Sequence, residues 1–209
     1  MALKAGMRPN KIVFSGVGKT PLEIGYAIDK KILLINVESK SELIEIEKIA
    51  RSKKRIVNVG IRLNPNTDAK TLSQISTGKK ENKFGVNEEI FHEMIKYSKS
   101  SKYINVKCLS VHIGSQILDY KPYEKMLKII DKTIKKSNHK FDYIDLGGGM
   151  GISYKKNDKK LNYKKYNMAI KQFLKDHKSK IIFEPGRSIV GNIGLLISKV
   201  TYIKESSKK

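Results

Sequence analysis

Two short motifs in the second half of the chain combine residue types suited to binding an anion. The first is a run of three glycines after the apolar stretch that ends at Leu146, and the second is a Glu-Pro-Gly-Arg segment after the next apolar stretch, residues 181–183. Consecutive glycines leave backbone N–H groups uncovered, and Arg adds a fixed positive charge, which suits a phosphate monoester. One glycine run alone indicates a tight turn, whereas two such loops on successive strands favour a single anion site. The residues that these motifs contribute are Gly147, Gly148, Gly149, Glu184, Pro185, Gly186 and Arg187.

The elements that would position these motifs form a regular alternation of strand and helix. Apolar runs predict strands at residues 11–14, 32–37, 57–63, 106–111, 143–146 and 181–183. Helical periodicity predicts helices at residues 21–28, 43–50, 88–99, 123–134 and 163–173, with Ser41 able to cap the second. The polar segment 64–86 is long for a strand-to-helix connection, which indicates function or mobility. A last β-rich stretch covers residues 194–203.

Six strands without polar alternation predict a parallel sheet covered by helices, in an α/β fold. Candidate site residues such as Gly16, Asn36, Arg62 and His112 fall just after the strand ends. A (β/α)8 barrel gathers its active site at those ends and often holds phosphate with the loops after strands 7 and 8. A doubly wound sheet is the alternative, because it uses the same edge. A (β/α)8 barrel has eight strand–helix units, so the six predicted here would leave it two units short.

The composition excludes several classes of protein. The net charge is +23, but 38 lysines against five arginines are spread over nearly every predicted helix, which disfavours a nucleic-acid interface. No apolar run approaches the ~20 residues of a membrane span. The single Cys108 excludes an intrachain disulfide and is compatible with a reducing cytoplasm, where we expect the protein to work. Gly18-Lys19-Thr20 is not the end of a phosphate-binding P-loop, because Val13 stands where that motif needs its first glycine.

Several segments together resemble the diaminopimelate decarboxylase family, fold-type III pyridoxal-phosphate enzymes related to ornithine and arginine decarboxylases and to alanine racemase. The matching segments occur in family order and with family spacing over nearly the whole chain. They are residues 13–20, 35–39, 62–65, 75–78 (Ile-Ser-Thr-Gly), 83–85, 112–116 (His-Ile-Gly-Ser-Gln), the glycine run and residues 184–188.

The resemblance implies a cofactor, pyridoxal 5′-phosphate, and roles for individual residues. His112 would stack on the cofactor ring, Ser115 and the glycines would bind its phosphate, and Glu184 would face the pyridine nitrogen. Arg187 would meet the phosphate or a carboxylate of the amino-acid substrate, and Arg62 would lie near the cofactor. Asp145 is interpreted as a structural hydrogen-bonding partner rather than a catalytic base.

The resemblance also implies that the chain is part of a larger enzyme. Its strands would be barrel strands three to eight, with residues 1–193 a partial barrel domain and residues 194–209 the start of a C-terminal β-domain. The family's Schiff-base lysine, on the first barrel strand, has no counterpart here. We therefore expect no catalytic lysine in this chain, no activity from it alone, and a homodimer for the full-length enzyme.

The activity implied is decarboxylation of meso-diaminopimelate to L-lysine, in lysine biosynthesis. Two alternatives stay open: a non-catalytic homologue that binds or regulates, and a decarboxylase of the ornithine and arginine group. A nucleic-acid-binding protein is a third, motivated only by the charge.

Overall fold

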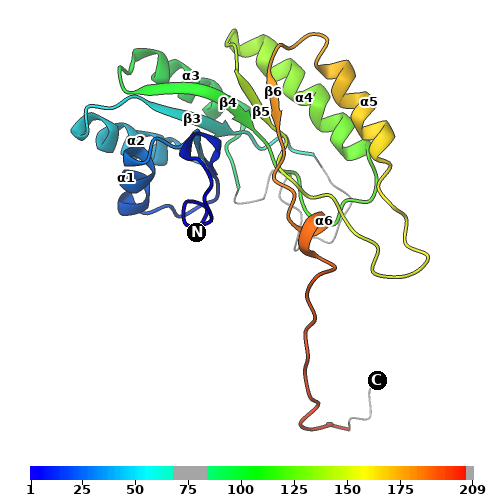
Figure 1. The fold of residues 1–209 in the computed structure, drawn as a ribbon. Coiled ribbons are helices and arrows are strands. Elements are labelled where there is room, and N and C mark those ends of the chain that lie inside the picture. Colours follow the sequence, from blue (N-terminus) through cyan, green and yellow to red (C-terminus); the bar gives the residue numbers. More distant parts are fainter. Residues whose placement is uncertain (68–83, 206–209) are drawn as a thin grey trace.

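The computed structural model describes residues 1–67 and 84–205, and its centre is a curved, six-stranded parallel sheet (Figure 1). The strands are β1 (Val13–Phe14), β2 (Leu34–Val37), β3 (Val57–Arg62), β4 (Ile104–Ser110), β5 (Tyr143–Asp145) and β6 (Lys180–Ile182). Within the described residues, each strand pairs with its neighbours in sequence, in the order β1-β2-β3-β4-β5-β6. Strands follow one another in this sequential order in the wall of a barrel, whereas in a doubly wound sheet the strand order reverses near the middle. The prediction of a barrel is therefore confirmed, and the alternative of a doubly wound sheet is wrong.

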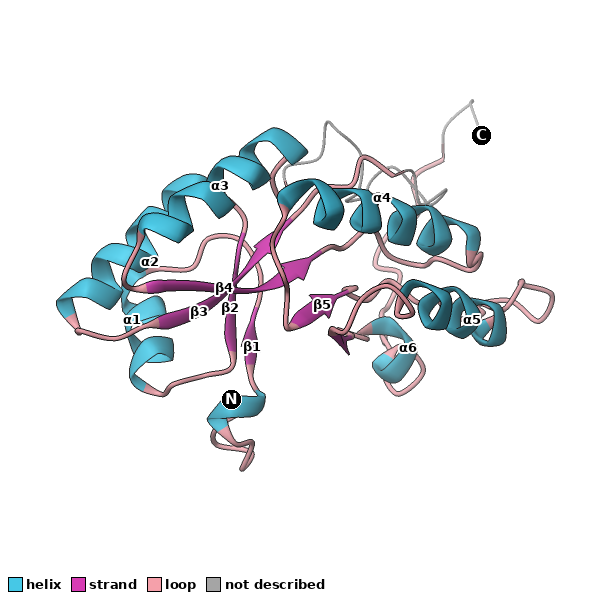
Figure 2. Cartoon of the chain, turned by 90° about the horizontal axis from the view of Figure 1, so that it is seen from above, coloured by secondary structure: helices cyan, strands magenta, loops and turns pink. Residues whose placement is uncertain are grey.

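The long helices lie along the outer side of the sheet, as Figure 2 shows from above. They are α1 (Pro21–Asp29), α2 (Lys40–Ser52), α3 (Glu88–Ser100), α4 (Lys121–Ser137) and α5 (Tyr163–Phe173), with a 3-10 turn η1 (Pro9–Lys11) and a short α6 (Arg187–Val190). The main core forms between these helices and alternate strand residues, among them Ile35, Val59 and Leu109. The intervening strand positions, such as Asn36 and Gly60, face the inside of the curve.

The helix starts follow local capping chemistry. Thr20 caps α1 in a capping box with Glu23, and Pro21 supplies the first helical residue. The prediction that Ser41 caps the second helix is wrong, because α2 begins at Lys40 and its backbone is capped by Ser39, whose hydroxyl accepts from the Glu42 N–H at 3.1 Å. Ser39 keeps the extended backbone that a capping residue needs.

The last part of the chain differs from its sequence pattern. Residues 194–203, expected to be β-rich, contain no strand and are exposed throughout. After α6 this segment extends away from the sheet (Figure 1). Its apolar side chains, such as Leu196 and Tyr202, are more than 90% exposed, so a strand there has no neighbour to pair with. The division at residue 193 stays a prediction, and most of the expected functional loop, including residues 75–78, lies outside the described residues.

Candidate functional site

A cavity of about 270 Å³ opens where the parallel strands end. Its walls come from the ends of β1, β2, β3, β4 and β6, because the carboxyl ends of parallel strands meet at one edge of the sheet. Of the residues expected at a site, Gly16, Asn36, Arg62, His112 and Glu184 all line it. The structure also places Ser15, Glu38 and Ser110 in the wall, three residues for which no role was predicted. Like the predicted residues, these three lie at or just after a strand end, and that position in the sequence could have identified them.

Arg62 brings a positive charge to the cavity and is held there by an acid. Its Nη1 lies 2.7 Å from Oε1 of Glu38, and only 13% and 4% of the two side chains are exposed. The other oxygen of Glu38 accepts from the N–H of Gly85 at 3.2 Å, and the Arg62 guanidinium stacks over the ring of Phe84. Removing either partner would leave a largely buried charge unpaired, which costs about 3–5 kcal/mol. The pair therefore fixes Arg62 in the wall.

His112 stands beside Arg62 with its protonation fixed by its surroundings. Its Nδ1 accepts a hydrogen bond from the N–H of Gly148 at 3.1 Å, which puts the proton of the neutral ring on Nε2. Burial, and next the positive charge of Arg62, lower the pKa of His112 from 6.5 to about 4. The imidazole is therefore uncharged at neutral pH and offers a flat face to an aromatic ligand.

The glycine run packs backbone against backbone between neighbouring loops. A Cβ on Gly148 would lie 2.2 Å from the carbonyl oxygen of Glu184, and one on Gly149 would lie 2.3 Å from that of Gly114. The N–H groups of Gly147 and Gly148 are already used, by Asp145 and His112, while within the described residues those of Gly149 and Gly186 donate no hydrogen bond. The run thus joins the loops after β4, β5 and β6, and leaves one of its three N–H groups for a ligand.

Arg187 reaches across to the loop after β4. Its Nε donates to the hydroxyl of Ser115 at 3.3 Å, and its Nη1 donates to the hydroxyl of Tyr154. No carboxylate in the described part of the chain forms an ion pair with Arg187, so its charge stays available for an anion. Tyr154 was not among the residues predicted for the site. The guanidinium carbon of Arg187 lies over its aromatic ring, 5.8 Å from the ring centre, which is a cation–π contact.

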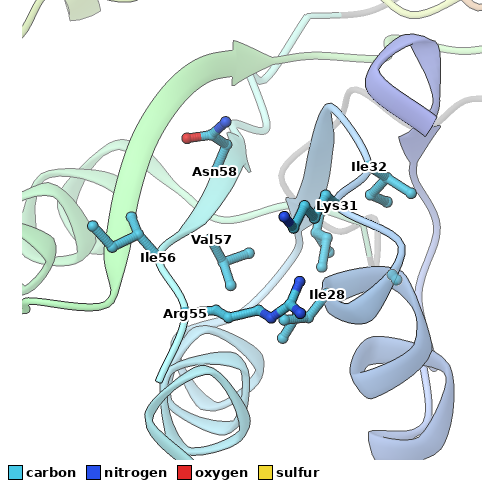
Figure 3. Close-up of a pocket in the computed structure, with 9 residues that line it drawn as sticks. Ile28, Lys31, Ile32, Arg55, Ile56, Val57 and Asn58 are labelled. Carbon is cyan, nitrogen blue, oxygen red and sulfur yellow. The ribbon is translucent and has the colours of Figure 1, made fainter. Parts of the chain in front are cut away.

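A second and larger cavity, of about 520 Å³, lies at the opposite end of the sheet (Figure 3). It is bounded by the turns that lead into β2 and β3 and lined by residues such as Ile28, Ile32, Lys31 and Arg55. Arg55 donates to the backbone oxygen of Asp29 at 3.4 Å. This end of a parallel barrel serves stability rather than chemistry.

Residues 1–191 match the family model of the pyridoxal-dependent decarboxylases, pyridoxal-binding domain. The chain belongs to this family. Its cofactor is therefore pyridoxal 5′-phosphate, as expected, and the barrel fold is that of the family's domain.

Named relatives indicate which enzymes of this family the chain resembles. The chain is 45% identical over 212 residues to a diaminopimelate decarboxylase of Helicobacter pylori and 42% identical over 217 residues to that of Aquifex aeolicus, with all of this chain covered in both. It spans about half the length of each, 52% and 50%. The resemblance to diaminopimelate decarboxylases is confirmed.

Solved structures agree with this. A variant of the H. pylori diaminopimelate decarboxylase, crystallised with L-lysine, superimposes with a TM-score of 0.87 at 43% identity, covering 90% of this chain and 48% of that one. An arginine decarboxylase of the Paramecium bursaria Chlorella virus, at 24% identity and a TM-score of 0.72, shares the fold.

None of the helices in residues 1–67 and 84–205 combines the length and apolarity needed to cross a membrane. In the same residues, no cluster of His, Cys, Asp and Glu could hold a metal ion.

Proposed function

We propose that this chain is the cofactor-binding part of an enzyme that decarboxylates meso-diaminopimelate to L-lysine. The observation that carries the proposal is the cavity at the strand ends, which is lined by both the uncharged ring of His112 and the carboxyl group of Glu184. The identity of 45% to a diaminopimelate decarboxylase over the whole chain supports the choice of substrate.

The residues present fit pyridoxal phosphate. His112 offers a flat uncharged face for the pyridine ring, and the carboxylate of Glu184 would face the ring nitrogen and keep a proton on it. The N–H groups of Gly149 and Gly186, which donate no hydrogen bond within the described residues, would bind the phosphate together with the hydroxyl of Ser115. When bound, the cofactor supplies an electron sink for the carbon from which CO2 leaves.

Around that cofactor, the chain's own groups would position the substrate and control charge. Arg187 would bind a carboxylate of the substrate, because its guanidinium is held by two neutral hydroxyls and keeps its charge unpaired in the described residues. Burial, and next the charge of Arg62, which is paired to Glu38, would keep His112 in its uncharged form by lowering its pKa. An uncharged imidazole would not repel a protonated pyridine ring. Pro185 and Gly147 would hold the shape of the loops that carry these groups.

The test is a complete enzyme in which this chain is joined to the parts of the H. pylori relative that the match leaves out. We expect CO2 release from meso-diaminopimelate that depends on added pyridoxal phosphate, with L-ornithine and L-arginine turned over at least about 100-fold less efficiently. Preference for L-arginine or L-ornithine would assign the chain to the other decarboxylase branch. Cofactor binding without any turnover would favour the non-catalytic alternative.

A further inference from the structure

One hydrogen bond joins the two edges of the sheet across the mouth of the cavity. Ser15 follows β1 and Glu184 comes after β6, the first and last strands of the sheet. The hydroxyl of Ser15 donates to Oε1 of Glu184, with 2.5 Å between the two oxygens. A hydroxyl bonded to an ionised carboxylate has a length of roughly 2.5–2.7 Å, and such a bond is about twice as strong as one between neutral groups. Ser15 therefore contacts the carboxyl group that the proposed function places against the cofactor ring.

The direction of this bond is set by Asn36, which lies within β2 with 1% of its surface exposed. Its amide nitrogen donates to the hydroxyl oxygen of Ser15 at 2.9 Å and to Oδ2 of Asp145 at 2.8 Å, with a longer contact of 3.4 Å to the hydroxyl of Ser110. An amide nitrogen carries two hydrogens, and the two short bonds use both. Because the oxygen of Ser15 accepts from Asn36, its own hydrogen is left to donate, and it is directed to Glu184.

Two neighbours keep the Asn36 amide from turning over. Asp145, at the end of β5, accepts through both oxygens, since its Oδ1 is bonded to the N–H of Gly147 at 2.9 Å. A reversed amide would place its oxygen against Oδ2 of Asp145 and would lose both donated bonds. In the observed orientation the amide oxygen has no partner in the described residues and lies so close to Gly60, in β3, that a Cβ there would be 2.0 Å away. The glycine makes room for this orientation, in which the two donated bonds outweigh the unpaired oxygen.

The loop that carries Ser15 is fixed further along by a buried ion pair. Nζ of Lys19 donates to the carbonyl oxygen of Gly16 and lies 2.8 Å from Oε1 of Glu42, in α2. Only 1% of the Lys19 side chain is exposed. Gly16 has a φ of +107°, a backbone conformation that suits glycine. Ser15 thus begins a loop whose shape is set by protein contacts alone, which lowers the cost of ordering it around a ligand.

We propose that Ser15 is a positioning residue that fixes, through its bond to Oε1, how the Glu184 carboxylate is turned, so that Oε2 is the oxygen that meets the cofactor's ring nitrogen. Asn36 acts through Ser15, by keeping its hydroxyl directed at Glu184. The inference rests on the proposed function for the identity of the group that Glu184 meets. A purely structural Ser15 would instead tie β1 to β6, and its loss would lower the stability of the sheet without changing how the cofactor is bound.

The first experiment asks whether the bond is made in the 209-residue chain without cofactor. A double-mutant cycle of Ser15→Ala and Glu184→Ala, followed by urea unfolding, isolates the interaction between the two side chains. We expect the double variant to be more stable than the two separate losses predict, by a factor of at least about 5 in the ratio of folded to unfolded chain. Ser100→Ala is the matched control, since its hydroxyl donates within α3 to the backbone oxygen of Tyr97 at 2.8 Å, and its effect should simply add to that of Glu184→Ala. Additive effects of Ser15→Ala and Glu184→Ala would overturn the proposal.

The second experiment measures binding of pyridoxal phosphate to the same variants by equilibrium dialysis, together with the nitrogen-15 NMR resonance of cofactor labelled at its ring nitrogen. We expect Ser15→Ala to weaken binding about 5-fold and to move the resonance towards that of the unprotonated ring, whereas Ser100→Ala changes neither. In a Glu184→Ala background, Ser15→Ala should have no further effect on either quantity. Unchanged affinity and resonance in Ser15→Ala, with folding established by circular dichroism, would refute the positioning role.

Ser15→Thr and Ser15→Val provide a second comparison, because the two new side chains have nearly the same shape and differ in the hydroxyl. Any strain from the added methyl group is common to both, so Ser15→Thr should bind the cofactor more tightly than Ser15→Val. Equal binding by these two variants would also refute the positioning role. Absence of binding by the unsubstituted chain would instead count against the proposed function, while the double-mutant cycle would still decide whether Ser15 holds Glu184.

Discussion

The sheet carries a cavity at each end, and the residues that line the two cavities differ in kind as well as the cavities in size. The larger, at the amino ends of β2 and β3, is bounded by isoleucines and two cations at its edge (Figure 3). The smaller, at the carboxyl ends, gathers two carboxylates, an arginine, an uncharged histidine and three neutral hydrogen-bonding side chains in about 270 Å³. Volume follows from how the helices happen to pack, whereas converging buried polar groups cost stability and persist where they serve a ligand.

The largest expected effect separates the two ends directly. In the completed enzyme, Glu184→Gln should lower kcat/KM by about 100-fold or more, because the charge that would keep the ring nitrogen protonated is lost. Arg55→Ala, at the opposite cavity, should leave kcat/KM within about twofold of the unsubstituted enzyme. Steady-state CO2 release measures both. Comparable losses from the two substitutions would remove the functional distinction between the ends.

A second prediction tests why the glycine run is glycine. Gly148→Ala should destabilise the chain by about 2 kcal/mol or more, because its Cβ would lie 2.2 Å from the backbone oxygen of Glu184 and neither backbone can yield easily. Gly186→Ala is the matched control, since its Cβ would meet nothing within 4 Å and its backbone φ of −98° suits any residue. Urea unfolding followed by circular dichroism compares them. Equal stability of the two variants would mean that the loops are not packed as described.

A third prediction concerns the charge offered to the substrate. Arg187→Ala should reduce kcat/KM for meso-diaminopimelate about 10-fold, mainly through KM, because a charge-assisted contact to a carboxylate is lost. Lys159→Ala, in the exposed loop after the glycine run, should change neither constant. An unchanged KM in Arg187→Ala would exclude the carboxylate contact.

Much of this fold could be predicted from the sequence. The six strands, their order and the polar residues at their ends were predictable, because a parallel sheet puts every carboxyl end at one edge and apolar runs mark where each strand stops. Arg62 and His112 follow from that rule alone. The ends of the strands were less certain. β2 begins at Leu34, two residues after the apolar run starts, because the N–H of Ile32 donates to the carbonyl of Ala27 in α1 and that of Leu33 to the carbonyls of Pro9 in η1 and of Ile12.

The hydrogen-bond network at the centre of the site was not predictable in the same way. Asp145 could be assigned as a hydrogen-bonding residue, and it is one. That Asn36 donates both to Asp145 and to Ser15, which in turn donates to Glu184, depends on how the curved sheet brings the ends of β1, β2, β5 and β6 together. Likewise, the glycines were expected to expose three N–H groups, but two are used inside the fold, since the neighbouring Asp145 and His112 are acceptors. Local sequence gives the residue types at a strand end, and packing decides which of their polar groups remain for a ligand.

The smallest expected effect follows from two opposite pKa shifts in the same cavity. The pKa of His112 falls to about 4, so between pH 4 and 6.5 the unfolded chain binds more protons at this residue and its contribution to stability rises with pH. The pKa of Asp145 rises to about 7, so between pH 4 and 7 the folded chain binds more protons there and its contribution to stability falls with pH. The two contributions have opposite signs over pH 4–6.5, so they oppose each other and the unsubstituted chain should show only a weak dependence of stability on pH from this pair.

Each of two single variants removes one of these opposing contributions to the stability of the unsubstituted chain. Relative to it, His112→Gln should lose stability as pH rises from 4 to 6.5, because the His112 contribution, which rises over that range, is gone. Asp145→Asn should gain stability relative to it over pH 4–7, because the Asp145 contribution, which falls over that range, is gone. Urea unfolding across this pH range measures both slopes, and subtracting the profile of the unsubstituted chain removes the exposed carboxylates common to all three. Two variants whose profiles run parallel to that of the unsubstituted chain would show that His112 and Asp145 keep ordinary pKa values in the folded protein, and the contrast between the two ends of the sheet would then rest on geometry without charge.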